Sequence, residues 1–186
     1  MKQKQSNTTT TTMKKLIITL LLAVLPSLIF AQTTAFDKFE KDGVDAVIVS
    51  RKMFELMGNV KMDPKDKTAQ QYLDLIKKLD NLKVYSTTNG KIVSEMKSTV
   101  DGYLKKYPLE ELMRINEGNR TIKIYVKSGA TSSQVKELLM FMEGGGPKDS
   151  TVLMSLTGNF DLSEISFLTD YMKLPGGAAL KKASKK

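Results

Sequence analysis

The chain has 186 residues, a formal net charge of +9, 41% apolar residues, and neither cysteine nor histidine. That length fits one domain with a substantial core, and the two missing residue types exclude Ser-His-Asp catalysis, Cys-His chemistry and nearly all zinc sites. Much of the positive charge belongs to lysines near the two ends, so the nearly neutral body lacks the dense basic face that nucleic-acid binding needs.

The first element in chain order is an export signal, and we expect residues 1–31 to be a signal peptide. Met13 is expected to be the true start of translation. Two lysines give it a charged beginning, residues 16–30 form an apolar centre, and Ala31 supplies a small residue for cleavage. The apolar run is shorter than the ~20 residues of a membrane span. Gln32 stands where a lipid-bearing cysteine would be. We expect cleavage after Ala31 and a periplasmic or secreted protein without a stable membrane anchor.

Hydrophobic spacing predicts two strands and two helices in the next part of the chain. In chain order these are a strand over residues 44–50, a helix over 68–79, a strand over 82–87 and a helix over 91–107. Residues 51–57 fit either an extension of the first strand or a short helix. Asn89 and Gly90 are typical of a tight turn, and Pro108 ends the second helix.

After Pro108 the spacing changes to that of strands. The pattern predicts strands over residues 109–116, 121–127, 135–143 and 151–157, and a last helix over 162–172. Residues 135–143 also fit a helix, but the strands on either side favour a strand. The last strand is expected to end at Gly158, and Asp161 with Glu164 forms a capping pattern for the helix. Residues 175–186 are expected to form a flexible, lysine-rich tail.

This order of elements predicts a single α+β domain over residues 32–174. We expect an antiparallel sheet of about five to six strands, with the helices packed mainly on one face.

Six short strings in this domain resemble one known family. They cover residues 49–54, 82–85, 111–113, 124–127, 136–140 and 156–162. The chain resembles, over roughly residues 35–174, the exported bacterial envelope proteins that contain the domain of unknown function DUF4252. The resemblance implies an α+β domain and an envelope location, and it supplies neither an activity nor catalytic residues. Other members often carry a lipoprotein cysteine after the signal, and Gln32 departs from that pattern.

A Ser/Lys pair is the sharpest catalytic hypothesis. Ser94 and Lys97 match Ser-x-x-Lys, and Lys127 begins a Lys-Ser-Gly string, as in penicillin-binding proteins and β-lactamases. Lys97 would deprotonate Ser94 one helical turn away. However, the chain is too short for that fold, the Ser-x-Asn element is missing, and both residues lie off the apolar stripe of their helix. A solvated polar pair is the preferred interpretation.

Other candidate sites have simpler interpretations. Methionines such as Met53 and Met140 suit Cu(I), but methionine more often fills gaps in a core. Glu110 and Glu111 are adjacent in a strand and therefore point to opposite faces. The glycine-rich turn at residues 144–147 lacks the Lys-Ser/Thr of a phosphate loop. We expect no catalytic, cofactor-binding or metal-binding residues.

The leading functional prediction is a non-enzymatic binding or accessory role in the cell envelope. The expected partner is an envelope protein or a small amphipathic ligand, not a nucleic acid. A Ser/Lys-type hydrolase is one alternative, and a structural or regulatory envelope stress component is the other. An exposed apolar patch without a deep cavity would favour the structural or regulatory component over ligand binding.

Overall fold

A computed structural model of the chain describes residues 35–131, 133–144, 146, 149–173 and 175–183. The chain divides into two units, Met1–Lys38 and Phe39–Lys186. The second unit contains nearly all of the described residues. The expected signal peptide over residues 1–31 lies outside them.

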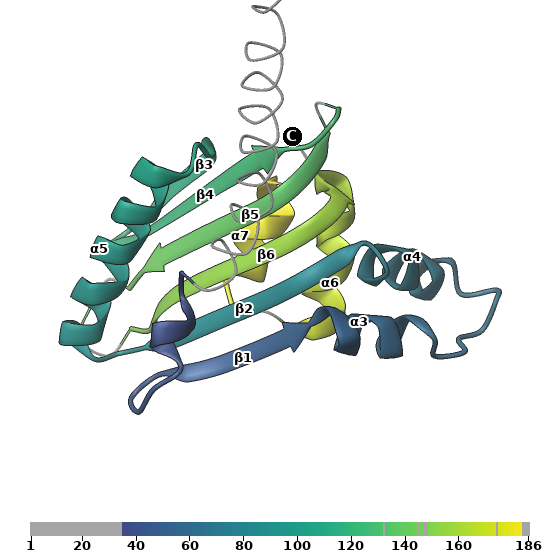
Figure 1. The fold of residues 1–186 in the computed structure, drawn as a ribbon, viewed down its shortest axis with the longest axis horizontal. Coiled ribbons are helices and arrows are strands. Elements are labelled where there is room, and N and C mark those ends of the chain that lie inside the picture. Colours follow the sequence, from purple (N-terminus) through teal and green to yellow (C-terminus); the bar gives the residue numbers. More distant parts are fainter. Residues whose placement is uncertain (1–34, 132, 145, 147–148, 174, 184–186) are drawn as a thin grey trace, which may run out of the picture. The chain divides into compact units, whose positions relative to one another are not determined.

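The described part of the chain begins with a mixture of helices and strands, continues with four consecutive strands and ends in helices (Figure 1). The elements in chain order are η1 (Asp37–Phe39), β1 (Asp45–Ser50), α3 (Arg51–Gly58), α4 (Lys67–Ile76), β2 (Leu79–Thr87), α5 (Gly90–Lys106), β3 (Glu110–Glu117), β4 (Arg120–Ser128), β5 (Gln134–Glu143), β6 (Thr151–Asp161), η2 (Leu162–Glu164), α6 (Ile165–Met172) and α7 (Gly177–Ala183). Among the described residues, no helix is both long enough and apolar enough to cross a membrane.

All strands of the described chain join one antiparallel sheet in the order β1-β2-β6-β5-β4-β3. Strands β3 to β6 form a meander of sequence neighbours, and β6 then pairs with β2. Strands β1 and β3 are consequently the two edges of the sheet. The predicted α+β fold with an antiparallel sheet is confirmed.

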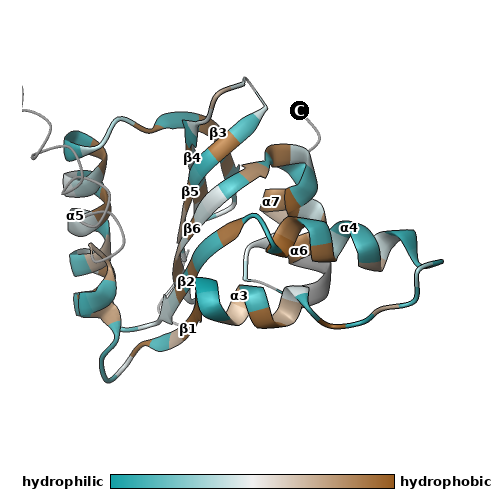
Figure 2. Ribbon diagram, turned by 45° about the vertical axis from the view of Figure 1, so that its right-hand side comes forward, coloured by the Kyte–Doolittle hydropathy of each residue, from teal (hydrophilic) through white to brown (hydrophobic). Residues whose placement is uncertain are grey.

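Helices α3, α4, α6 and α7 lie on one face of the sheet and α5 lies on the other (Figure 2). The larger core cluster lies under the four helices and includes Phe54, Ile76, Leu82, Met154 and Leu168. The predicted placement of helices mainly on one face is correct, and α5 is the exception among the described helices. Strands β5 and β6 are almost continuously buried, so both of their faces need cover.

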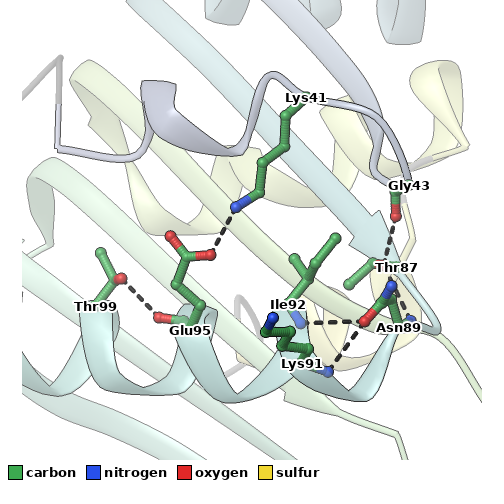
Figure 3. A network of polar contacts seen from close by, with 8 residues as sticks. All are labelled: Lys41, Gly43, Thr87, Asn89, Lys91, Ile92, Glu95 and Thr99. Carbon is green, nitrogen blue, oxygen red and sulfur yellow. Dashed lines mark hydrogen bonds and ion pairs between the residues drawn. The ribbon is translucent and has the colours of Figure 1, made fainter.

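Helix α5 begins at a network of polar contacts rather than at a hairpin turn (Figure 3). Asn89 is the N-cap of the helix, and its side chain accepts hydrogen bonds from two backbone N–H groups of the first turn. The Thr87 hydroxyl donates to the Gly43 carbonyl at 2.6 Å and accepts from the Asn89 N–H at 3.1 Å. Lys41 pairs with Glu95 at 2.6 Å. The expected tight turn at Asn89 and Gly90 is therefore wrong, because Asn caps helices as well as it makes turns.

Residues 51–57, which fit two structures in the sequence, form helix α3. Ser50 is its N-cap, and the Ser50 hydroxyl accepts a hydrogen bond from the Met53 N–H at 3.5 Å. Phe54 is fully buried on the inner side of the helix. The cap and this one large apolar anchor account for the change from strand to helix at Arg51.

The expected solvated tail is also wrong for the residues that the structure describes. Residues 177–183 form helix α7, with Ala179, Leu180 and Ala183 buried. The chain enters the helix through Gly176, whose φ of 77° favours glycine. Lys182 lies on the outer side and pairs with Glu117 of β3 at 3.1 Å. The lysines of this segment indicate an exposed tail in the sequence, although its small apolar side chains pack against the core.

Candidate functional site

The most distinctive surface feature is a group of exposed apolar side chains on β1, on α3 and just after α3. Each of the five is between 42% and 57% exposed. They are Val47, Ile48, Met53, Leu56 and Val60, and we call them the β1–α3 surface. Single exposed apolar residues are common, but several of them close together along the chain mark an interaction site more often.

Strand β1 contributes to this surface because it is an edge strand. Its only buried residue is Val49, which lies opposite Leu82 of β2. Val47 and Ile48 point to opposite faces of the sheet, yet both stay exposed. The strand therefore offers apolar side chains on both faces beside its outer backbone edge.

Helix α3 contributes because only one of its sides is used for packing. Phe54 and Gly58 are buried, whereas Met53 and Leu56 lie on the outer side. Met53 and Leu56 are three residues apart, a spacing that places them on one helical face. The expectation that Met53 fills the core is therefore wrong, whereas Met140 is fully buried as expected.

Charged side chains surround the apolar group. Arg51 contacts Asp80 at 2.9 Å and Glu55 at 3.6 Å, and Lys52 contacts Glu55 at 3.5 Å. These side chains are about half exposed or more, so the pairs contribute little to stability. These charged side chains can therefore rearrange at low energetic cost.

The opposite edge of the sheet, β3, has the features that protect an edge. A bulge interrupts its pairing with β4 between Glu111 and Met113. Arg114 donates two hydrogen bonds to the Glu111 carboxylate, at 2.9 and 2.6 Å, and this contact lowers the pKa of Glu111. Charges and bulges are the usual means by which proteins block strand-to-strand association. Strand β1 has no bulge, and its one charged residue, Asp45, stands at its beginning.

A buried carboxyl group lies between α5 and the sheet. The Tyr103 hydroxyl of α5 donates to Glu137 Oε1 of β5 at 2.5 Å, and Glu137 is only 2% exposed. Within the described residues, Glu137 Oε2 and the Thr157 hydroxyl have no hydrogen-bond partner. Glu137 and Thr157 are opposite each other in the β5–β6 register. Glu137 is not among the residues singled out from the sequence, although an acidic residue in an otherwise apolar run is a signal that could have found it.

Burial raises the pKa of Glu137, and the Tyr103 hydrogen bond and the charge of Lys127 oppose that shift. Burial is also the main cause of a raised pKa at Tyr103, and the bond to Glu137 adds to it. Because both pKa values are raised, the two groups do not ionise together, and the contact is either neutral or carries one negative charge. Neither Tyr103 nor Glu137 lines either of the two hollows described below, and we interpret the arrangement as a structural contact between α5 and β5.

The Ser/Lys pair lies on the exposed side of α5. The Ser94 hydroxyl donates to the Gly90 carbonyl at 3.0 Å, and the Lys97 ammonium donates to both Glu143 oxygens at 3.0 and 3.1 Å. Both residues line a shallow, polar depression of about 510 Å³, and Lys127 is not among the described residues that line it. The hydroxyl and the ammonium therefore have separate partners.

A second hollow of about 240 Å³ lies between α7 and strands β3 and β4. Its floor includes Ile115, Ile122 and Met142, and its rim carries the paired Glu117 and Lys182. Pockets that enclose small molecules usually measure about 300–1,000 Å³. This hollow is too small to make a ligand pocket the leading interpretation.

The remaining candidates have structural roles. Asp161 and Glu164 form the predicted capping box, which confirms that interpretation. Glu110 and Glu111 are exposed. The described residues contain no group of three or more acidic side chains placed to hold a metal ion. These residues do not converge on a common point.

Comparison with known proteins gives one match. The model of a family described as a domain of unknown function, DUF4252, matches residues 36–168. No curated protein and no solved structure matches the chain significantly.

Proposed function

The chain belongs to the DUF4252 family, and from this premise we propose that it is an exported, non-enzymatic accessory protein of the cell envelope that binds another protein through the β1–α3 surface. The observation that carries the proposal is the exposure of five apolar side chains on β1, on α3 and just after α3. Burying such side chains at an interface is the main favourable contribution to protein association.

The hollows support protein contacts over ligand binding. One described hollow is shallow and polar and the other is small, so neither would enclose a drug-sized apolar molecule. By contrast, the β1–α3 surface combines an apolar centre with a charged rim at Arg51, Lys52 and Glu55. An apolar centre with a polar rim is the usual composition of a protein interface.

Export is the second part of the proposal and rests on the sequence of the signal. We expect the protein recovered from the envelope fraction to begin at Gln32, as determined by N-terminal sequencing or intact mass. Replacement of an apolar residue in the signal centre, Leu21→Arg, is expected to block export, because a charge interrupts the apolar run. A protein that stays in the cytoplasm with residues 13–31 attached would contradict this part of the proposal.

Binding is tested by placing a photo-crosslinking amino acid at Leu56 in the expressed, exported protein. We expect a specific adduct with another envelope protein, and none from the same group placed at exposed Lys105 of α5. In a pull-down, Leu56→Glu is expected to reduce recovery of that partner by about tenfold or more, because it introduces a charge into an apolar contact. Lys105→Glu is the matched control, and thermal unfolding confirms that both variants fold.

Two results would overturn this function. One is equal crosslinking from Leu56 and Lys105, which would show that the β1–α3 surface has no specific partner. The other is hydrolysis of a cell-wall or ester substrate by the purified protein that disappears in Ser94→Ala, which would establish the Ser/Lys hydrolase instead.

A further inference from the structure

We propose that a second copy of this chain occupies the β1 half of the β1–α3 surface, through antiparallel pairing of the two β1 strands into one continuous sheet. The inference rests on the proposed function, since it names one partner of the same surface. It leaves the exposed side of α3 available for a different protein.

The backbone of β1 is suited to strand pairing. Its register with β2 is regular from Asp45 opposite Ser86 to Ser50 opposite Asn81, without a bulge. The strand contains no proline or lysine, and it forms an edge of the sheet that the described residues make. A regular, apolar edge strand is a template for another strand.

The side chains of β1 are also suited to a copy of themselves. Val47 and Ile48 are about half exposed on opposite faces, so pairing would bury apolar surface above and below the sheet. A two-fold axis perpendicular to the sheet keeps each face aligned with the same face of the partner. Both copies then contribute the same apolar side chains to each layer.

Charge selects the direction and the register of the pairing. The strand begins at the acidic residue Asp45, and the basic residues Arg51 and Lys52 directly follow its last residue. Antiparallel pairing places the acidic beginning of each copy beside the basic end of the other, whereas parallel pairing would place like charges together. Electrostatic complementarity of this kind favours a self-complementary dimer.

One register satisfies both the charges and the apolar residues. When Ile48 lies opposite its own copy, Val47 lies opposite the partner's Val49, and Asp45 lies beside the beginning of the partner's α3, where Arg51 is the first residue. A register centred on Val47 would instead place Asp45 opposite Val49. Within the described part of the chain, the side-chain contacts of Arg51 to Asp80 and Glu55 are exposed, so Arg51 can rearrange at little cost.

A single introduced cysteine tests this register directly, because the chain has no cysteine of its own. In the proposed dimer the two residues at position 48 face each other with Cα atoms about 4.5–5.5 Å apart, which is within disulfide range. We expect Ile48→Cys to form a covalent dimer under mild oxidation. Ala46→Cys is the matched control on the same strand and face, where the two sulfur atoms would be about 13 Å apart. Its yield of covalent dimer should be lower by about tenfold or more.

A charge exchange between Asp45 and Arg51 provides a second test. Recovery of affinity in the double variant could not be explained by misfolding of the single variants. Asp45→Arg and Arg51→Asp are each expected to weaken the dimer at least about fivefold, as measured by sedimentation or light scattering, because each change creates two repulsive contacts. The double variant should restore the wild-type affinity. Glu110→Lys on the β3 edge is a control that should leave the affinity unchanged.

The outcomes separate this inference from the proposed function. A purified protein that stays monomeric at about 100 µM would overturn the dimer, since an interface weaker than this has little free energy. Equal disulfide yields from Ile48→Cys and Ala46→Cys would overturn the register, and with it the proposed pairing. If either result is found but Leu56 still gives a specific adduct with another envelope protein, the proposed function remains supported. If the dimer forms but the Leu56 adduct is absent, the proposed function is contradicted and the dimer is not.

Discussion

Replacement of Gly158 by valine is expected to lower the free energy of unfolding by about 3 kcal/mol, because the position has no room for a side chain. A Cβ atom there would lie 2.4 Å from the Lys78 carbonyl oxygen and 2.9 Å from the Leu79 Cα. Both are backbone atoms, which cannot rotate away as the end of a side chain can. The measurement is urea unfolding followed by circular dichroism.

The close approach at Gly158 has a function in the sheet. Gly158 lies in β6 opposite Leu79 of β2, where the register shifts between Leu79 and Asn81. The Asn159 N–H donates to the Lys78 carbonyl at 2.8 Å. A substitution that pushes these backbones apart would break this hydrogen bond and disturb the pairing of two central strands.

Gly102 is the matched control for this prediction. It lies inside α5, and no other atom comes within 4 Å of the place that a Cβ atom would take. Gly102→Ala is therefore expected to raise the free energy of unfolding by up to about 1 kcal/mol, because glycine is the less favourable residue in a helix. Equal effects of the two substitutions would contradict the steric argument.

Gly158 also shows why the sequence predicts the end of β6 incorrectly. Glycine at the end of a largely apolar run normally marks a turn, so the pattern ends the strand at Gly158, whereas β6 continues to Asp161. Gly158 is needed inside the strand because the backbone at Lys78 and Leu79, where β2 begins, passes close to it. That contact joins residues almost eighty positions apart. Local patterns describe a residue and its neighbours but not a distant backbone.

Elements with strong local signals were predicted well. The stripe of Met96, Val100 and Tyr103 gave α5 nearly its full length, and these are its buried residues. The prediction of a strand over residues 135–143 is correct for the reason that favoured it, since the strands on either side, β4 and β6, both pair with β5. By contrast, helix α7 has only small apolar residues among lysines, and its burial depends on contacts with the rest of the fold.

The candidate site was much less predictable than the fold. Exposure of Met53 and Leu56 depends on which side of a short helix faces the sheet, and that choice is made by the position of Phe54. Exposure of Val47 depends on β1 being an edge, which is a property of the whole topology. An apolar residue in sequence is assigned to the core unless the arrangement of strands is known.

Stability is expected to depend on pH through Glu137, the buried carboxyl group of β5. Burial is the main cause of its raised pKa, while Tyr103 of α5 and Lys127 of β4 oppose the shift and Tyr107 lies beside Tyr103. Because the pKa is higher in the folded state than in the unfolded state, the unfolded chain loses the proton first as pH rises. The stability that this group contributes is therefore complete below its ordinary pKa of 4.5 and is lost as pH rises through the folded value.

Glu137→Gln removes this ionisation with little change in shape. The variant and the wild type are expected to have similar free energies of unfolding in acid, and the variant should become increasingly more stable as pH rises towards 8. Lys136→Gln, an exposed change on the same strand, should leave the shape of the pH profile unchanged. A constant difference between Glu137→Gln and the wild type at every pH would contradict a raised pKa.

Tyr103→Phe tests the other half of the contact. Above the folded pKa of Glu137, the substitution is expected to cost about 2 kcal/mol, because it removes the hydrogen bond at 2.5 Å and leaves both carboxylate oxygens without a described partner. In the Glu137→Gln background the same substitution should cost less, since a neutral amide loses a weaker bond. Equal costs in the two backgrounds would show that Tyr103 acts through packing alone, and a difference that grows with pH would establish that the Tyr103–Glu137 bond holds α5 against the sheet.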